Sequence, residues 1–369
     1  MSTQKKARAF VITNPMIAEN RSSEVTLSKF LRVIRPCYDT LTVIGGNLSV
    51  EPDLNDVELI SFEINRSFNK IKRLMDIIKV QLKMCSAVRR EIESGDQVFF
   101  WIGDKMLLPY HAARSRKAQI NYFIMGNVSK EGAASKFTLL SSKLIRHMAA
   151  NADYVCMESK SVIDEWPGLV AKKTRVLHLY TDGIEMSPIE NREKVLGMVC
   201  RLTAGKHVLE CIEAMSRIHS VHPEWKLEII GSGKQKAECE ASIEELKAKE
   251  YVSLIGWVEH NEIFERANKW KYLLFPTDTE GVPNGLIEMM GRGLPALASP
   301  VGGVKDIVRD GVNGFVLQEP SAELIAQGIL RMIDQEGESY KKLCEEANRT
   351  IFAEFSLTKA IDRARRELC

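Results

Sequence analysis

Short apolar runs, separated by segments with a helical period, recur along the first half of the chain. Residues 97–102 (QVFFWI) are apolar almost throughout, as expected for a strand that is covered on both faces. The other runs of this half that indicate strands are residues 9–13, 41–45, 120–124, 154–156 and 175–177. Within residues 135–150 the apolar positions recur at helical spacing instead. This alternation predicts a parallel sheet with helices on both faces.

The same alternation starts again after a turn-like stretch at residues 180–191. The strands expected in this second half are residues 195–199, 226–230, 252–255, 272–275 and 296–298. Helical patterns occupy residues 208–218 and 237–249. We therefore predict two doubly wound domains with a short connector near residue 185. Because ligands of such sheets bind beyond the carboxyl ends of the strands, the cleft between the domains is the expected site.

The composition is that of a soluble globular protein: 45% of the 369 residues are hydrophobic and 27% are charged. No apolar run approaches the roughly 18–20 residues that span a bilayer, and no apolar signal core precedes Phe10. The eight cysteines are scattered without a C-x-x-C pair, which is typical of reduced thiols and not of a zinc site or a disulfide framework. These features predict a cytoplasmic protein.

The net charge of +2 conceals an asymmetry between the two halves. Residues 1–185 hold 27 Lys and Arg against 20 Asp and Glu, a net +7, which leaves 24 against 29, a net −5, for residues 186–369. The basic half is therefore expected to face an anionic partner. No basic stripe with interleaved aromatic residues is present, so nucleic acid is not the expected partner.

Residues 276–288 (PTDTEGVPNGLIE) form the most informative loop. It follows a buried strand, and a helix is expected to begin near Asn284 and to end at Arg292. The N–H groups of that helix N-terminus would form an anion site at the strand ends. Glu280 precedes the helix and Glu288 lies on its second turn. Considered alone, these two carboxylates could equally well be solvated surface groups.

Two cations follow the strand at residues 195–199. Arg201 lies at the carboxyl end of the strand, and Lys206 lies at the start of the next helix. Two fixed cations at strand ends suit a diphosphate leaving group, whose negative charge grows as its bond breaks. Solvated cations at a turn are the alternative. Gly231-Ser-Gly233 also follows a strand, but a plain tight turn explains it equally well.

Residues 252–316 resemble the signature region of family 4 glycosyltransferases, which are retaining enzymes with the GT-B fold. An E-x7-E pair, a Gly-x-Pro after a short helix, a Gly-Gly turn and a D-G-x-N-G-F turn occur in order and at the expected spacing. Weaker similarity covers most of the chain. The resemblance implies an α/β fold of two Rossmann-like, doubly wound parallel-sheet domains that face a central cleft. Residues 1–185 would bind the acceptor, residues 186–369 the nucleotide sugar, and about 350–369 would cross back to the N-terminal domain.

The resemblance also implies roles for individual residues. Arg201 and Lys206 would hold the donor phosphates, Glu280 would hold the donor sugar near its reacting carbon, and these three are the expected catalytic residues. Glu288 would accept hydrogen bonds from the ribose. Relatives commonly place the base near Gly256-Trp-Val258; the alternative is an ordinary strand end with Trp257 packed between helices. The expected donor-binding set is Arg201, Lys206, Gly256, Trp257, Val258, Glu280, Gly281, Val282, Pro283, Asn284, Gly285 and Glu288, with no metal.

The N-terminal half departs from the family pattern in two places. Many relatives have a Gly-Gly loop after the first strand, whereas residues 14–23 contain no glycine. Many also have a histidine after the strand that corresponds to residues 120–124, where this chain has Met125-Gly-Asn. The candidates for the acceptor side are therefore Asn14, Arg21, Gly126 and Asn127.

Residues 70–92 predict a strongly amphipathic helix. Its apolar stripe is expected to pack on the sheet; the stripe consists of Ile71, Leu74, Met75, Ile78, Leu82, Cys85 and Ile92. Its cationic face is expected to rest on anionic lipid headgroups; the face consists of Lys72, Lys79, Lys83 and Arg90. Each such cation contributes about 1 kcal/mol near a membrane surface. The hypothesis is a peripheral protein on the inner face of the cell membrane with a lipid-linked or membrane-embedded acceptor.

Together these features predict a retaining, metal-independent glycosyltransferase of polysaccharide biosynthesis. It would move a sugar from a nucleoside diphosphate sugar, its donor substrate, to a hydroxyl acceptor on a glycan or glycolipid, without a cofactor. One alternative is a catalytically silent binding protein that kept the donor domain. The other is a nucleotide-sugar epimerase or isomerase on the same fold.

Overall fold

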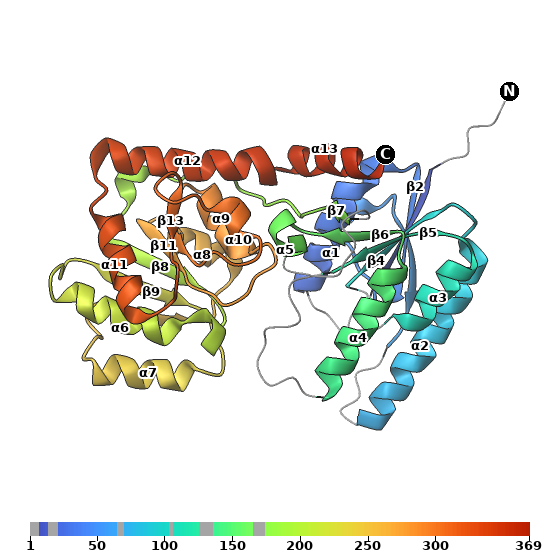
Figure 1. Cartoon of the computed structure of the whole chain (residues 1–369), viewed down its shortest axis with the longest axis horizontal. Coiled ribbons are helices and arrows are strands. Elements are labelled where there is room, and N and C mark those ends of the chain that lie inside the picture. Colours follow the sequence, from blue (N-terminus) through green and yellow to red (C-terminus); the bar gives the residue numbers. More distant parts are fainter. Residues whose placement is uncertain (1–6, 14–20, 65–69, 103–105, 125–135, 165–173) are drawn as a thin grey trace. The chain divides into compact units, whose positions relative to one another are not determined.

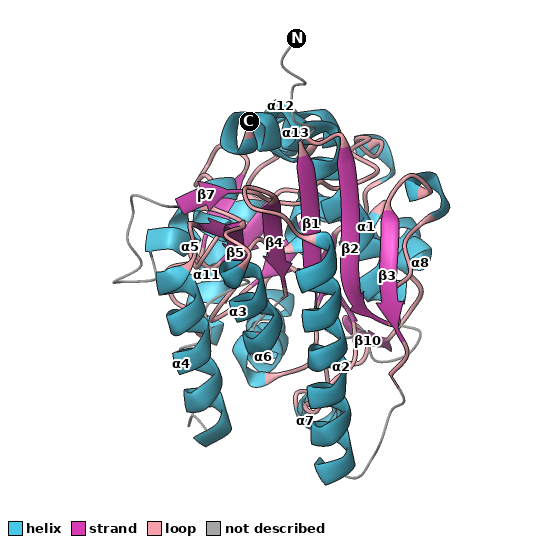
Figure 2. Ribbon diagram, turned by 90° about the vertical axis from the view of Figure 1, so that its right-hand side faces the viewer, coloured by secondary structure: helices cyan, strands magenta, loops and turns pink. Residues whose placement is uncertain are grey.

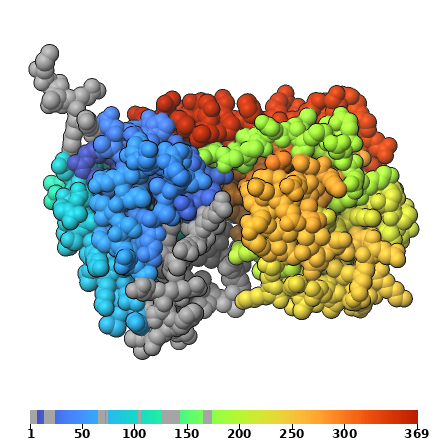
Figure 3. Space-filling model, turned by 180° about the vertical axis from the view of Figure 1, so that it is seen from behind, coloured from blue at the N-terminus to red at the C-terminus, as the bar shows by residue number. Residues whose placement is uncertain are grey.

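The computed structural model describes residues 7–13, 21–64, 70–102, 106–124, 136–164 and 174–369. The chain divides into two compact units (Figure 1). Unit 1 comprises Met1–Tyr180 together with Leu357–Cys369, and unit 2 comprises Thr181–Ser356. In the space-filling view, blue marks the N-terminal part of unit 1, and yellow and orange mark unit 2 (Figure 3).

The described strands of unit 1 form a seven-stranded parallel sheet in the order β3-β2-β1-β4-β5-β6-β7. The strands are β1 (Arg8–Thr13), β2 (Thr40–Gly46), β3 (Glu58–Phe62), β4 (Gln97–Trp101), β5 (Gln119–Phe123), β6 (Tyr154–Met157) and β7 (Thr174–Val176). Alternate residues of β1 enter different cores, since Phe10 and Ile12 face one side of the sheet while Ala9 and Val11 face the other.

Helices cover both faces of this sheet. The α-helices described in unit 1 are α1 (Arg21–Ile34), α2 (Lys70–Glu91), α3 (Leu107–Ser115), α4 (Lys136–Asn151), α5 (Lys160–Asp164) and α13 (Leu357–Leu368). Helices α2, α3 and α4 supply Met84, Tyr110 and Met148 to one core, and Figure 2 shows these helices in front of the strands. Helices α1 and α13 supply Phe30 and Ala360 to the other core.

Unit 2 has the same architecture, with a six-stranded parallel sheet in the order β10-β9-β8-β11-β12-β13 among its described residues. Its strands are β8 (Val195–Val199), β9 (Lys226–Ile230), β10 (Val252–Gly256), β11 (Tyr272–Phe275), β12 (Ala296–Ala298) and β13 (Gly314–Val316). Its α-helices are α6 (Val208–His219), α7 (Lys236–Glu245), α8 (His260–Ala267), α9 (Asn284–Gly291), α10 (Val304–Ile307), α11 (Ala322–Ile333) and α12 (Gly337–Phe355). No described helix of either unit is long and apolar enough to cross a membrane.

The pattern of the sequence missed two strands and overextended one helix. Strand β3 lies at the edge of its sheet and is only partly buried, so it lacks the continuous apolar run of a central strand. Strand β13 has three residues and begins at a glycine, which gives too short a pattern to detect. Helix α7 ends at Glu245, before the predicted residue 249, and Lys247 adopts a left-handed φ of 51° that stops it.

The prediction that the whole apolar stripe of α2 packs on the sheet is wrong. Cys85 and Ile92 are buried, but Met75, Ile78 and Leu82 are 52%, 44% and 57% exposed. The side chains of Ile71 and Leu74 lie outside the described residues. A helix of this length spans about 33 Å, whereas a strand of five to seven residues spans about 17–23 Å. The N-terminal end of α2 therefore projects beyond the strands, as Figure 2 shows.

Candidate functional site

Two loops meet at the carboxyl edge of the sheet in unit 2. Loop 200–207 follows β8 and loop 276–283 follows β11, and these two strands are neighbours in the sheet. Their carboxyl ends lie at the same edge because the strands are parallel. The backbone N–H of Asp278 donates to the carbonyl oxygen of Gly205 across 3.0 Å, which joins the loops directly.

The ammonium of Lys206 lies at the centre of this junction. It donates to the carboxylate of Glu280 and, across 3.1 Å, to the hydroxyl of Thr277. The Lys206 and Glu280 side chains are 19% and 17% exposed, so solvent screens their ion pair only partly. Arg201 is exposed at the end of β8. The expected catalytic residues Lys206 and Glu280 are thus in contact with each other.

The Gly-Gly turn at Gly302 and Gly303 packs directly against loop 276–283. Gly303 donates its N–H to the carbonyl oxygen of Gly281 across 2.8 Å. Gly302 has a φ of +47°, and a Cβ at this position would lie 1.9 Å from the carbonyl oxygen of Glu280. A glycine is therefore required sterically at residue 302. On the other side of the loop, the hydroxyl of Ser299 accepts the N–H of Thr277 across 3.0 Å.

Helix α9 begins directly after this loop with unsatisfied donors. The N–H groups of Leu286 and Ile287 both bond to the carbonyl oxygen of Pro283 across 3.1 Å. In the part of the chain that the structure describes, no hydrogen-bond partner is present for the N–H groups of Asn284 and Gly285. They can bind an anion or a sugar oxygen at the positive end of the helix dipole.

Glu288 lies one turn further along α9 and is 16% exposed. One of its carboxylate oxygens is 3.2 Å from Nε2 of His260, at the start of α8. His260 could not be identified from the sequence pattern, since a residue 28 positions away has no periodic relation to Glu288.

The segment expected to bind the base lies at the end of β10. Gly256 has a φ of +88°, and Trp257 after it is 69% exposed. The alternative in which Trp257 is packed between helices is therefore wrong. An exposed indole at a strand end offers a flat face on which a ring can stack.

The Gly-Ser-Gly turn after β9 supports the loop that carries the cations. A Cβ at Gly231 would lie 1.8 Å from the carbonyl oxygen of Cys200. The two backbone segments are therefore too close together for any residue other than glycine at this position. Leu202 donates its N–H to the carbonyl oxygen of Ser232 across 3.0 Å and accepts the N–H of Gln235 across 3.1 Å. The turn therefore fixes the backbone on both sides of Arg201. Burial raises the pKa of the Cys200 thiol to about 12, so this cysteine is not a nucleophile at neutral pH.

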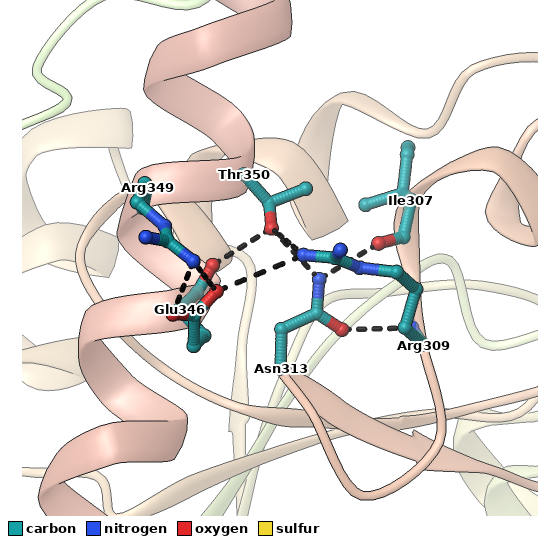
Figure 4. A network of polar contacts seen from close by, with 6 residues as sticks. All are labelled: Ile307, Arg309, Asn313, Glu346, Arg349 and Thr350. Atoms are coloured by element: carbon teal, nitrogen blue, oxygen red, sulfur yellow. Dashed lines mark hydrogen bonds and ion pairs between the residues drawn. The ribbon is translucent and has the colours of Figure 1, made fainter.

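The D-G-x-N-G-F turn is a structural anchor (Figure 4). Asn313 is fully buried; its oxygen accepts the N–H of Arg309 across 2.8 Å, and its amide donates to the Ile307 carbonyl oxygen and the Thr350 hydroxyl. Thr350 belongs to α12, where its hydroxyl also donates to the carbonyl oxygen of Glu346. The motif therefore binds α12 to the loop before β13.

The acceptor-side candidates cannot be placed in the same way. Asn14, Gly126 and Asn127 lie outside the described residues, and so does the side chain of Arg21, whose backbone begins α1. Among the described residues, no group of three or more His, Cys, Asp or Glu side chains is arranged to hold a metal ion.

Known proteins resemble this chain both in sequence and in fold. Residues 183–350 match the family described as Glycosyl transferases group 1. The exopolysaccharide phosphotransferase SCO2592 of Streptomyces coelicolor is 32% identical over 145 residues, which are 39% of this chain and 15% of that protein. The poly(glycerol-phosphate) alpha-glucosyltransferase of Bacillus subtilis is 27% identical over 162 residues, which are 43% of this chain and 23% of that protein. The chain thus spans less than a quarter of the length of these two relatives.

The crystal structure of HepE from Anabaena in complex with UDP superposes on nearly the whole chain. The TM-score is 0.76 and the identity 16%, and the alignment covers 98% of this chain and 99% of that one. The predicted GT-B fold with two parallel α/β sheets is confirmed. Every residue of the site described above lies within residues 183–350, the segment that matches the glycosyl transferases group 1 family.

Proposed function

We propose that this chain transfers a sugar from a nucleoside diphosphate sugar to a hydroxyl acceptor in the synthesis of a cell-surface glycan, with retention at the anomeric carbon. The observation that carries the proposal is the position of Lys206, between Glu280 and Thr277, at the edge to which Arg201 and the start of α9 also belong. This arrangement combines cations, free N–H donors and carboxylates in one place.

The leaving group of the reaction is a nucleoside diphosphate, whose charge grows in the transition state. Arg201 and Lys206 offset that charge, and the dipole of α9 adds to their effect. Because two cations and a helix N-terminus are available, we propose transfer without a metal ion. When the diphosphate binds, Lys206 exchanges Glu280 for phosphate oxygens. The released Glu280 carboxylate then accepts hydrogen bonds from the donor sugar.

The rest of the donor lies along the same edge of the sheet. Glu288 accepts hydrogen bonds from the ribose hydroxyls, and the base stacks on Trp257 after Gly256, with Val258 beside it. Gly281 and Val282 line the sugar, next to Pro283, Asn284 and Gly285. UDP is the first nucleotide to test, since HepE has been solved with UDP and with UDP-glucose. The Bacillus subtilis relative, named for transfer of glucose to poly(glycerol phosphate), supports a cell-surface polymer as acceptor.

The first experiment measures thermal stabilisation by UDP, GDP and ADP and their sugar conjugates. A ligand at one hundred times its dissociation constant adds about 2.7 kcal/mol of stability. We expect one nucleoside diphosphate to raise the unfolding midpoint, Glu288→Ala to abolish that rise and Lys206→Ala to reduce it. Lys194→Ala is the matched control, because Lys194 forms an exposed ion pair with Glu224 in the same unit.

The outcome separates the proposal from its rivals. No stabilisation by any nucleotide would overturn the glycosyltransferase proposal. Binding without transfer to any glycan acceptor would favour a silent binding protein. Conversion of the sugar nucleotide to an isomer, with no released diphosphate, would favour an epimerase.

We further propose that unit 1 binds an anionic membrane through α2. At about 100° per residue, Met75, Ile78 and Leu82 lie within roughly 60° of each other on the helix. The cations beside them lie within roughly 40°; they are Lys72, Lys79, Lys83 and Arg90. All seven residues are exposed. An apolar strip next to a cationic strip is typical of a helix that lies in the membrane interface.

The neighbouring helix α3 also exposes an apolar and a cationic side chain, Leu108, which is 41% exposed, and Arg114. The chain would then work on the cytoplasmic face of the membrane, where a lipid-linked acceptor is accessible. Flotation with vesicles of phosphatidylcholine, with and without phosphatidylglycerol, tests this. We expect binding only to the anionic vesicles, and its loss in Leu82→Glu and Lys83→Glu. Val221→Glu is the control, since Val221 is 63% exposed in unit 2; equal binding to both vesicles would overturn the proposal.

A further inference from the structure

His207 follows Lys206 directly and has an unusual backbone conformation. Its φ of 50° and ψ of 38° lie in the left-handed region, between the turn Ala204–Lys206 and helix α6. A side chain with a Cβ is sterically disfavoured in that region, whereas a glycine is not. A histidine here is therefore strained, and contacts of its side chain must offset the strain.

The imidazole of His207 lies between two carboxylates, and its hydrogen bond is with Asp278. Nε2 lies 2.7 Å from Oδ1 of Asp278, whereas Nδ1, 3.4 Å from Oε1 of Glu210, has no hydrogen-bond partner among the described residues. Because a carboxylate only accepts hydrogen bonds, Nε2 carries the proton that it donates to Asp278. The His207 side chain is 15% exposed and is therefore more buried than the side chains of Glu210 and Asp278.

Three consecutive residues of loop 200–207 thus contact loop 276–283. Gly205 accepts the N–H of Asp278, Lys206 donates to Glu280, and His207 donates to the Asp278 side chain. The residues before and after Lys206 are therefore both attached to Asp278. A phosphate that binds the Lys206 ammonium would replace the contact with Glu280, whereas the two contacts of Asp278 would remain.

We infer that His207 is a positioning residue for the donor diphosphate. Together with Asp278 it holds the backbone of Lys206 against loop 276–283, so that the ammonium stays at the phosphate after Glu280 has turned to the sugar. The inference rests on the proposed function, because it requires a diphosphate at Lys206. His207 itself need not touch the ligand.

The test combines substitutions at His207 with Lys206→Ala and measures the dissociation constant of whichever of UDP, GDP or ADP binds wild type. We expect His207→Gly to weaken binding about tenfold, although it relieves the strain and keeps or raises the unfolding midpoint. In the Lys206→Ala background the same change should alter affinity less than twofold, since His207 acts through Lys206. Asp278→Ala should weaken binding as much as His207→Gly does. The double variant His207→Gly with Asp278→Ala should bind no more weakly than either single variant.

Rescue and control variants complete the design. His207→Asn should regain part of the affinity, because asparagine tolerates the left-handed conformation and its amide can donate to Asp278. His222→Ala serves as the control for loss of a histidine in unit 2. Wild-type affinity in His207→Gly would overturn the inference and leave the proposed function intact. Wild type that binds none of the three nucleotides would overturn both.

Discussion

The backbone of Gly302 lies so close to the carbonyl oxygen of Glu280 that a Cβ at residue 302 would be 1.9 Å from that oxygen. The two residues belong to different loops, one before α10 and one before α9. The position of the Glu280 carboxylate therefore depends on a glycine that contributes no side chain to the site.

Gly302→Ala should displace the loop that carries Glu280, because the added Cβ collides with backbone and the φ of +47° is unfavourable for alanine. We expect nucleotide affinity, measured by calorimetry, to fall at least tenfold, and the free energy of unfolding to fall by about 1–3 kcal/mol. Gly311→Ala is the matched control, with a φ of +69° and no atom within 4 Å of the added Cβ. It should lower stability by about 1 kcal/mol without changing affinity. Wild-type affinity in Gly302→Ala would refute the coupling.

Trp257→Ala should weaken nucleotide binding without destabilising the fold. Stacking of a base on an aromatic ring contributes about 1–3 kcal/mol, which corresponds to roughly five- to hundredfold in affinity. Trp257 is 69% exposed, so the unfolding midpoint should remain that of wild type. Inorganic pyrophosphate, which has no base, provides the control ligand. If its affinity fell as much as that of the nucleotide, the stacking role would be wrong.

Acid should destabilise unit 1 through His178. This side chain is 4% exposed, and burial, helped by the positive charge of Arg363, lowers its pKa to about 4. In the unfolded chain the pKa is about 6.5. Between these values the unfolded state binds more protons, so stability is lost as the pH falls from 6.5 to 4, by about 3 kcal/mol in total.

Thermal unfolding of wild type and His178→Asn between pH 7.5 and 4.5 measures this effect. Asparagine keeps an amide donor near the position of Nδ1, which lies 2.9 Å from the carbonyl oxygen of Leu179. The midpoint of the variant should fall less on acidification than that of wild type. His222→Asn, at a half-buried histidine of unit 2, should retain the wild-type dependence. Equal slopes in His178→Asn and wild type would contradict the assignment.

Asn313→Ala should destabilise unit 2 and leave the donor site intact. Three hydrogen bonds are lost at a fully buried side chain, and each contributes about 1 kcal/mol. We expect the unfolding free energy to fall by about 2–4 kcal/mol, measured with denaturant. Thr350→Val, which removes only one of these bonds, should cost less. An affinity loss in Asn313→Ala at temperatures where it stays folded would mean that the turn reaches the ligand.

The central strands could be predicted from the sequence because their physical signal is local. Strands β8, β9, β11 and β12 are apolar runs between polar or glycine-containing turns, and their predicted and observed bounds coincide. Lys206 and Glu280 could be assigned to the same edge of the sheet by similar reasoning, since each lies in a loop that follows a strand, but their contact with each other was not predicted.

Other features depend on neighbours that the pattern of the chain does not contain. The buried face of α2 depends on where the sheet beneath it ends, so Met75 and Leu82 are exposed although they fit the apolar stripe. The contact of His207 with Asp278 joins positions 71 residues apart and has no periodic signature. The left-handed conformation of His207 could not be expected either, since only a few per cent of non-glycine residues adopt it, even though histidine is enriched among them.

Helix α13 belongs to unit 1 although it follows unit 2 in the chain. Its Ala360 and Ala364 are buried against the same core as Leu27 and Phe30 of α1 (Figure 1). During synthesis from the amino end, unit 2 can fold as one uninterrupted stretch, whereas the core of unit 1 stays uncovered until α13 has left the ribosome. A nonsense codon after residue 356 would therefore leave unit 2 complete and would destabilise unit 1, although unit 1 is synthesised first.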